Sequence, residues 1–440
     1  MKVKDILGID FLLLIASISL TTFGILFIYS SGVTATGELV SYEYIKQIVW
    51  GGSGFLIALI ISMIHYRRFH GIALYLYIIT LLLLVCTLKF GRYVSGARAW
   101  LRFGMFGIQA SEFTKITTIL LLARYLDSTK EKRASFARFV ISCVIAFVPM
   151  SLILLQPDLG TSLVFIPILL IMCFVAGVPL RYVFFLFFVI CMGAFLLFLT
   201  LWQEYILKTS KAETYMAITM LTNKRFVSVI CLALGLIGLI ALAGFLLYKK
   251  QYFFWILYFC LVVVFSLGGS YMAFKVLKEY QLLRLIIFLN PNIDPQGAGW
   301  HIIQSLTAIG SGGVMGKGYL GGTHSHYRFL PQQSTDFIFS IFSEEWGLVG
   351  GLIMFLLFLL ISVRMARIMA TAADAFGSYI AAGLSALYIF HFMINVGMTM
   401  GMMPITGIPL LFMSYGGSSI ITAMMGIGFA LSIHMRRFTR

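Results

Sequence analysis

The amino-acid sequence predicts an all-α polytopic integral membrane protein, and three observations support this fold class. Of its 440 residues, 60% are hydrophobic and only 11% are charged, whereas a soluble domain carries roughly twice that charged fraction. The apolar residues come in runs of about 20, the length that a helix needs to cross a bilayer. These runs are continuous and do not alternate with period two, which favours helices over a closed β-barrel.

Hydrophobic runs predict about twelve membrane-spanning helices in the lipid bilayer. The expected spans are 11–30, 47–65, 71–89, 113–127, 138–156, 160–178, 182–202, 225–248, 252–274, 337–363, 378–402 and 417–435. They leave little chain for a separate soluble domain, so residues 1–440 are expected to form a single membrane domain.

The charge distribution predicts how the chain is oriented. The net charge is +16, and lysine and arginine gather in alternate short loops, for example at Arg67 and Arg68 and at Arg436 and Arg437. Positively charged loops face the cytoplasm, so with an even number of spans both termini are expected there. Because orientation accounts for the excess charge, no nucleic-acid partner is expected.

Two of the remaining, external loops are long and polar: 90–112 and 275–336. Long loops carry function more often than short connectors do, and we expect 275–336 to be a large external catalytic loop. It opens with a turn from Asp294 to Gly299, in which proline and two glycines follow the acid. Asp294 is either a turn-capping residue or a carboxylate on a stiff turn, able to accept a proton from a hydroxyl.

A glycine-rich run, Gly310–Gly322, follows in the same loop. It does not fit a phosphate-binding P-loop, because no strand precedes it and no Gly-Lys-Ser/Thr follows. It is either a flexible or re-entrant loop or a backbone that packs close to a ligand, with Lys317 offering charge to an anion. His324 and His326 alone are a weak metal site, so no metal ligand is predicted.

Acidic residues then enter the next span. Asp336 is a candidate helix cap, whereas Glu344 and Glu345 lie two turns deeper. Acids within a span are costly unless they are paired or face water. We therefore expect one of these two glutamates to face a polar cavity or a basic partner.

The external loop 90–112 combines basic, aromatic and acidic residues. Arg98 and Arg102 flank Trp100, and Glu112 and Lys115 share one face of the helix that follows. The last two are either a surface ion pair of little value or part of an interfacial cavity in which Arg98, Arg102 and Lys115 bind an anion. Trp100 is equally well explained as a membrane-interface anchor.

Two further external junctions break helices with proline and glycine. One holds Pro157 and Asp158, and the other extends from Pro404 to Ser419 and includes Ser414. Such breaks at membrane depth are tolerated where they line protein or a water-filled cavity. Asp158 and Ser414 are therefore further candidates for a substrate site.

Taken in order, these segments resemble those of the SEDS proteins (shape, elongation, division and sporulation), the RodA/FtsW/SpoVE group of bacteria. The matching pieces are GARAWLRFG, QASEFTK, QPDLGTS, DPQGAGW, AIGSGG, GKGYLGGT, FLPQQSTDFIFSIFSEEWG and PITGIPLLFMSYGGSS. GKGYLGGTHS and FLPQQSTDFIF look most like the RodA branch. The family usually has about ten spans, so the region 225–274 is expected to be an extra helix pair.

The resemblance implies a peptidoglycan glycosyltransferase of the bacterial inner membrane, which polymerises lipid II into glycan strands during cell elongation. It implies that Asp294 is the essential carboxylate and that Trp100, Glu112 and Lys115 are tied to activity. The implied partners are a class B penicillin-binding protein transpeptidase and other elongation proteins. Mg²⁺ or Mn²⁺ is a candidate cofactor that would steady the leaving pyrophosphate.

Two other functions stay open at this point. A lipid II flippase would place buried charges along a path through the bilayer, whereas the acids here cluster at one interface. A non-catalytic scaffold for a transpeptidase would not need Asp294. Arg98, Arg102, Lys317, Asp158, Asp336, Glu344 and Ser414 complete the set of residues expected to bind substrate.

Overall fold

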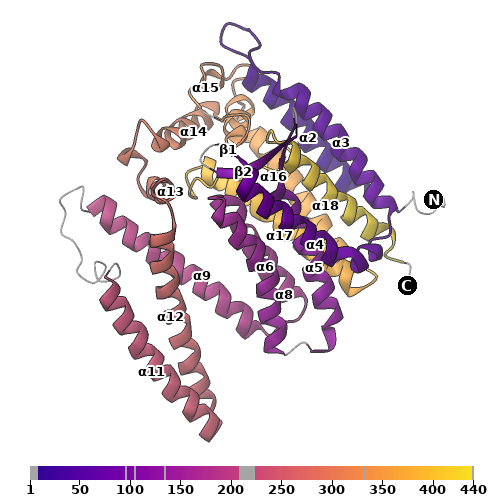
Figure 1. Cartoon of the computed structure of the whole chain (residues 1–440). Helices are drawn as coiled ribbons and strands as arrows, with labels where there is room; N and C mark the ends of the chain where they lie inside the picture. Colours follow the sequence, from indigo (N-terminus) through magenta and orange to yellow (C-terminus); the bar gives the residue numbers. More distant parts are fainter. Residues whose placement is uncertain are drawn as a thin grey trace. The chain divides into compact units, whose positions relative to one another are not determined.

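The computed structural model describes residues 8–94, 97–103, 106–132, 135–207, 223–330 and 332–438, and the described chain is mostly helical (Figure 1). Within it, 10 helices are long and apolar enough to cross a membrane. They are α2 (Phe11–Gly32), α3 (Glu43–Met63), α4 (Arg67–Phe90), α6 (Phe136–Leu155), α9 (Leu180–Leu201), α11 (Lys224–Tyr248), α12 (Gln251–Val276), α16 (Ile338–Thr371), α17 (Ala375–Thr399) and α18 (Gly417–Met435).

The two other predicted spans are also helical. The span at 113–127 is α5 (Ala110–Ser128), and the span at 160–178 is a short pair, α7 (Leu159–Leu163) and α8 (Phe165–Val175). Helix α5 is rich in serine and threonine and is buried along most of its length, so it needs no lipid-facing apolar surface. The helical multi-pass fold is confirmed, and the number of helices that cross the bilayer stays a prediction.

The chain divides into two compact units. Unit 1 comprises Met1–Val178 and His301–Arg440, and unit 2 comprises Pro179–Trp300. In unit 1 the central helix is α17, which packs against α5, α8, α16 and α18. Small residues permit this packing: a Cβ on Gly383 would lie 2.8 Å from the side chains of Ile119 and Met172.

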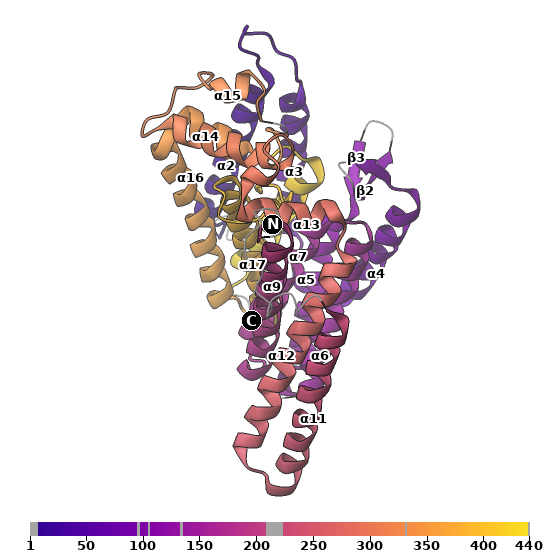
Figure 2. The ribbon, with the colours of Figure 1, turned by 90° about the vertical axis from the view of Figure 1, so that its left-hand side faces the viewer.

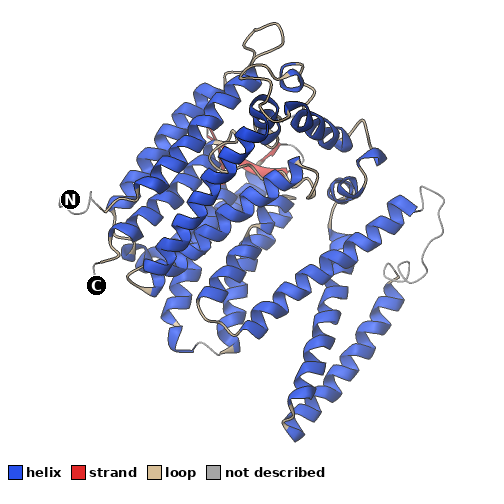
Figure 3. Ribbon diagram, turned by 180° about the vertical axis from the view of Figure 1, so that it is seen from behind, coloured by secondary structure: helices blue, strands red, loops and turns tan. Residues whose placement is uncertain are grey.

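A small antiparallel sheet occupies the predicted external loop 90–112 (Figure 3). It consists of β1 (Arg92–Val94), β2 (Ala97–Phe103) and β3 (Phe106–Gln109), in the order β1-β2-β3. The all-α expectation missed this sheet. One face of β2 is apolar (residues 97, 99, 101 and 103), and the other face carries two arginines on either side of Trp100. This alternation is incomplete, and the charges of the loop made it look like an irregular polar segment.

The predicted catalytic loop 275–336 is largely helical and not an extended loop. It contains α13 (Glu279–Leu289), the short turn η3 (Pro291–Ile293), α14 (Ala298–Gly312) and α15 (Thr323–His326). Helix α13 is amphipathic, because Leu282 and Ile286 pack against Leu197 and Leu201 of α9. Residues that looked like polar loop therefore form short helices with one buried face.

Unit 2 contains the predicted extra helix pair (Figure 2). Helix α11 packs against α12, and α12 packs against α9. The hairpin between α11 and α12 turns at Lys249, whose φ of 51° is left-handed. Residues 208–222, between α9 and α11, lie outside the described residues.

Candidate active site

Unit 1 has two chemically different ends. At one end lie both termini and a set of arginines, including Arg364, 2.7 Å from Asp10, and Arg67, 2.5 Å from Asp374 (Figure 1). At the other end α2, α4 and α17 finish and α5, α16 and α18 begin. That second end holds the predicted site residues of unit 1. Its assignment to the external side of the membrane stays a prediction.

Glu112 and Lys115 form an ion pair in the interior of unit 1. Lys115 Nζ lies 2.7 Å from Glu112 Oε1, and their side chains are only 1% and 2% exposed. The same Nζ lies 3.1 Å from His391 Nε2 on α17. The pair is therefore neither a surface ion pair nor, in this conformation, an open anion site, because buried charges persist only when they neutralise each other.

The broken segment between α17 and α18 is held by side chains of α17. His391 Nδ1 lies 3.1 Å from the carbonyl oxygen of Pro409, and Asn395 Nδ2 donates to the carbonyl oxygen of Ile408 at 2.8 Å. Irregular backbone at this depth needs such donors for its carbonyl groups. The predicted Pro/Gly break between α17 and α18 is confirmed. This segment packs closely against α7, because a Cβ on Gly160 would lie only 2.2 Å from Thr406 O.

Arg98, Trp100 and Arg102 lie on the central strand β2. Trp100 pairs with Gln109 of β3, and its ring lies where a Cβ on Gly107 would approach to 3.2 Å. Arg98 is exposed, and its backbone N–H donates to Gln156 O at 3.3 Å. The side chain of Arg102 lies outside the described residues. The sheet thus places the first two of these residues at the same end as the buried ion pair.

Asp158 and Ser414, two predicted substrate-site residues, satisfy local backbone groups. Asp158 is the N-cap of α7: Oδ1 accepts the N–H of Thr161 at 3.0 Å, and Oδ2 accepts from Gln109 Nε2 at 3.2 Å. The hydroxyl of Ser414 accepts the N–H of Leu410 at 2.8 Å. Both side chains therefore accept hydrogen bonds from nearby backbone N–H groups, and Asp158 also joins α7 to β3.

Asp336 precedes the helix that the acidic stretch was expected to begin. Helix α16 starts at Ile338, and its N-cap position is Phe337. The carbonyl oxygen of Asp336 accepts a hydrogen bond from Asn395 Nδ2 at 3.0 Å. This bond ties the entry of α16 to α17.

The glycine-rich run Gly310–Gly322 packs against an interruption of helix α16. Gly347 has φ 61° and ψ −157°, which interrupts the helix. The run supplies the missing backbone partners: Lys317 N donates to Glu344 O at 3.1 Å, and Leu348 N donates to Gly313 O at 3.0 Å. A Cβ on Gly316 would lie 2.1 Å from Glu345 O. The backbone of the run therefore packs closely against α16, and its contact with a ligand stays a prediction.

Glu344 is a fully buried carboxylate with a basic partner, as was expected of one of the two glutamates. Its Oε1 accepts from Lys317 Nζ at 2.7 Å, from Thr323 N at 2.8 Å and from His324 N at 3.0 Å. The charge of Lys317 is therefore already neutralised by the protein. The expectation that Lys317 offers its charge to a substrate anion is not supported by this geometry.

Glu345 joins the same region to helix α2. Ser30 donates its hydroxyl hydrogen bond to Glu345 Oε1, and Leu320 N donates to Oε2 at 3.1 Å. His326 Nε2 lies 3.9 Å from Glu345 Oε1, while its Nδ1 lies 2.7 Å from Val33 O.

Burial, with the charge of Glu345 nearby, raises the pKa of Tyr319 to about 12. Its protonated hydroxyl donates to Leu26 O at 3.0 Å.

Asp294 lies in unit 2, on the turn between η3 and α14. Its Oδ1 accepts the N–H of Gly297 at 2.9 Å, and its carbonyl oxygen accepts the N–H of Gly299 at 3.0 Å. A Cβ on Gly297 would lie 2.1 Å from Asp294 Oδ2, and one on Gly299 would lie 2.2 Å from Pro291 O. The carboxylate is half-buried and held by a turn that only glycines at these positions permit. Its catalytic role stays a prediction.

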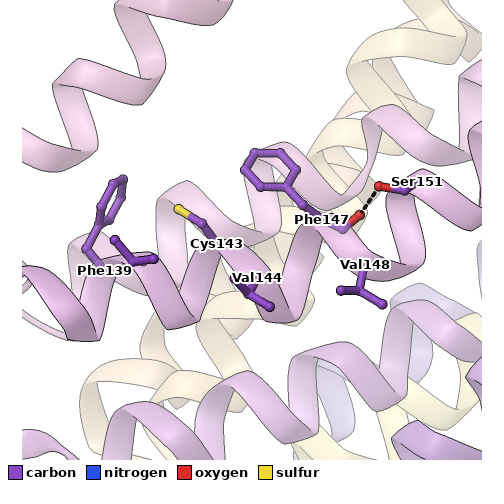
Figure 4. Close-up of a pocket in the computed structure, with 7 residues that line it drawn as sticks. Phe139, Cys143, Val144, Phe147, Val148 and Ser151 are labelled. Atoms are coloured by element: carbon purple, nitrogen blue, oxygen red, sulfur yellow. Dashed lines mark hydrogen bonds between the residues drawn. The ribbon is translucent and has the colours of Figure 1, made fainter.

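An apolar hollow of about 300 Å³ follows one face of α6 (Figure 4). Figure 4 shows Phe139, Cys143 and Phe147 on successive turns of that face. The complete lining is Phe139, Val140, Cys143, Val144, Phe147, Val148 and Ser151. The hydroxyl of Ser151 donates to Phe147 O at 2.7 Å. Apart from this hydroxyl and the thiol of Cys143, the lining is hydrocarbon, and it includes no carboxylate or base.

Among the residues that the structure describes, no group of three or more His, Cys, Asp and Glu side chains is placed to bind a metal ion. The donors of these described residues do not fit a resident divalent cation, and a Mg²⁺ or Mn²⁺ cofactor stays a prediction.

Sequence reasoning missed the polar residues of α17. His391 and Asn395 are spaced by four residues and so lie on one helical face. Both are buried, and they hold Lys115 and Ile408 respectively. Polar residues spaced by one helical turn within a span were the signal that could have identified them. Ser30 in α2 was missed in the same way.

Comparisons with known proteins identify the family. The chain matches the FtsW/RodA/SpoVE family model, described as cell cycle protein, over residues 11–216 and 202–438. It is 49% identical to peptidoglycan glycosyltransferase RodA of Treponema pallidum (strain Nichols), over 99% of this chain and 100% of that protein. It is 33% identical to peptidoglycan glycosyltransferase MrdB of Escherichia coli (strain K12), over 98% and 95% of the two chains.

Solved structures share the fold. A chain from a study of the structural coordination of polymerization and crosslinking by a peptidoglycan synthase complex superposes with a TM-score of 0.67 at 25% identity, covering 98% of this chain and 99% of that one. The crystal structure of Thermus thermophilus rod shape determining protein RodA has a TM-score of 0.59 at 23% identity, covering 98% of each chain. The chain described here therefore belongs to the FtsW/RodA/SpoVE family of cell cycle proteins.

Proposed function

We propose that this protein is a peptidoglycan glycosyltransferase that polymerises lipid II into glycan strands in the bacterial inner membrane during cell elongation. One observation carries the proposal: the chain matches peptidoglycan glycosyltransferases from end to end, at 49% identity over 99% of its length in the Treponema pallidum relative. The motif segments that suggested this reaction are all present. Those in unit 1 gather at the end of that unit opposite the termini.

The reaction joins the C4 hydroxyl of one lipid-linked disaccharide to C1 of another and releases undecaprenyl pyrophosphate. The bond from C1 to the pyrophosphate oxygen breaks, and the hydroxyl proton has to be accepted. We assign that proton to the carboxylate of Asp294. The turn supports this role, because Oδ1 is fixed by the N–H of Gly297 at 2.9 Å, so the carboxylate is already oriented before substrate binds.

The leaving pyrophosphate needs positive charge near it. Of the cations considered from the sequence, Lys115 is buried against Glu112 and Lys317 is paired with Glu344. We therefore assign the contact with pyrophosphate to Arg98, which is exposed, and to Arg102 on the same strand. A Mg²⁺ or Mn²⁺ ion carried by the pyrophosphate itself is a further proposal, and no step in this mechanism depends on it.

The lipid and protein partners follow from the same assignment. The hollow on α6 is lined mostly by apolar side chains, which suits a polyprenyl or acyl chain. We propose a class B penicillin-binding protein transpeptidase as the protein partner. The similar fold in a peptidoglycan synthase complex that coordinates polymerization and crosslinking supports this assignment.

The proposal is tested by giving the purified full-length chain lipid II in detergent micelles, without a partner protein. Micelles have no second leaflet, so a flippase yields no signal, and a scaffold without its transpeptidase yields no polymer. Glycan strands resolved by gel electrophoresis are the expected product. Unchanged lipid II, from protein that is folded and monodisperse, would overturn the proposal in favour of one of those alternatives.

A further inference from the structure

We propose that His391 is a positioning residue, which fixes the ammonium of Lys115 in its ion pair with Glu112. The inference rests on the proposed glycosyltransferase function, in which these two residues are tied to activity. It assigns a role to a buried histidine of α17 that belongs to none of the motif segments.

The two neighbours of His391 determine which ring nitrogen carries the proton. The carbonyl oxygen of Pro409, 3.1 Å from Nδ1, can only accept a hydrogen bond. The ammonium of Lys115, 3.1 Å from Nε2, can only donate one. The ring is therefore neutral with its proton on Nδ1, and the lone pair of Nε2 receives an N–H of Lys115.

Burial increases the free-energy cost of losing this hydrogen bond. The side chains of Lys115 and Glu112 are 1% and 2% exposed, and His391 is also 1% exposed. Water therefore cannot replace an acceptor that is lost, and an ammonium without its acceptor is left in a low-dielectric interior. Within the described part of the chain, Glu112 Oε2 makes no hydrogen bond. The position of the carboxylate thus depends on Lys115, and that of Lys115 on His391.

The arrangement links three parts of the site end of unit 1. Glu112 and Lys115 belong to α5, His391 belongs to α17, and Pro409 belongs to the broken segment that carries Ser414. His391 contacts two of these parts through opposite ring nitrogens. A shift of about 1 Å in a charged group of an active site lowers turnover on the order of 100-fold.

Two conservative substitutions separate the two contacts of His391. In His391→Gln, the side-chain oxygen reaches the position of Nε2 and still accepts from Lys115. In His391→Asn, the shorter amide reaches only the position of Nδ1 and still donates to Pro409 O. The matched control is Tyr388→Phe, one turn earlier on α17, which removes a buried hydrogen bond to Ala423 O (2.8 Å) that does not involve the ion pair.

The experiment measures kcat and KM for lipid II polymerisation with the wild type and these three variants. We expect His391→Asn to lose kcat about 10- to 100-fold with little change in KM, whereas His391→Gln and Tyr388→Phe stay within about threefold of the wild type. The opposite order, with Gln inactive and Asn active, would overturn the proposal, because Pro409 would then be the contact that matters. Equal losses in all three variants, or none in any, would overturn it as well.

A second readout needs no activity, so it distinguishes failure of this inference from failure of the proposed function. The chain has 7 histidines, and in a ¹⁵N-histidine NMR spectrum the signals of His391 are those that His391→Gln removes. A neutral ring with its proton on Nδ1 is expected. A doubly protonated ring, or a proton on Nε2, contradicts the inference. An inactive wild type with the expected spectrum refutes only the glycosyltransferase proposal.

Discussion

Replacing Lys317 by methionine removes the ammonium that pairs with buried Glu344, while it keeps most of the side chain's length. Breaking a buried pair costs about 3–5 kcal/mol of the free energy of unfolding. Here Lys317 is 25% exposed, and the carboxylate keeps hydrogen bonds from Thr323 and His324. We therefore expect the lower cost of about 2–3 kcal/mol.

The second substitution tests whether that cost comes from an unpaired charge. In Lys317→Met/Glu344→Gln the amide oxygen still accepts from Thr323 and His324, and no charge remains at position 344. We expect the double variant to regain at least about 1 kcal/mol relative to Lys317→Met, a coupling typical of side chains in direct contact. The assay is denaturant unfolding of four proteins in detergent, followed by tryptophan fluorescence: the wild type, Lys317→Met, Glu344→Gln and the double variant.

The same four proteins separate a structural lysine from one that binds substrate. If Lys317 serves Glu344, polymerisation recovers in the double variant together with stability. If Lys317 binds pyrophosphate, both variants that lack it stay inactive even when stability returns. A Lys317→Met variant within about 0.5 kcal/mol of the wild type would refute the reasoning, because the pair would then contribute nothing to the fold.

Two further predictions concern the packing within unit 1. Arg138 is buried and donates to Leu126 O at 2.8 Å and to Ala176 O at 3.1 Å, at the ends of α5 and α8. Arg138→Met is therefore expected to lower the free energy of unfolding by about 2–4 kcal/mol. An unchanged thermal midpoint would contradict this expectation. Gly316→Ala places a Cβ 2.1 Å from Glu345 O, so we expect it to abolish the monodisperse protein. In Gly313→Ala the Cβ meets nothing within 4 Å, so the free energy of unfolding should fall by only about 1–2 kcal/mol, the cost of a left-handed alanine. Equal yields of the two variants contradict the close packing of the glycine run.

The helical fold could be predicted because bilayer thickness and hydrophobic run length are directly related. The turn at Asp294 was also predictable, because proline and glycine act within a few residues. The sheet at 92–109 was missed, since short alternating strands give a weak signal beside a high density of charge. The alternation of polar and apolar residues in β2 is interrupted at Trp100, which weakened the signal further.

The environment of the charged residues could not be predicted from their own segments. Lys115 meets His391, which is 276 positions away, and Glu345 meets Ser30, which is 315 positions away. A one-turn spacing indicates that two side chains share a helical face, but not which face is buried. The sequence therefore left Glu112 and Lys115 open as a surface pair or as part of an anion-binding cavity. It also made Lys317 a candidate to bind an anion, because its contact with Glu344 could not be predicted.

The central claim is that Asp294 accepts the proton in lipid II polymerisation, and Asp294→Asn tests it most directly. Asparagine keeps the shape of the turn and an oxygen for the N–H of Gly297, but it cannot take up the proton. The control is Glu279→Gln, which neutralises an exposed carboxylate in the same unit. The account predicts a loss of polymerisation of at least about 100-fold for Asp294→Asn and normal activity for Glu279→Gln. Glycan strands formed by folded Asp294→Asn at the wild-type rate would contradict it.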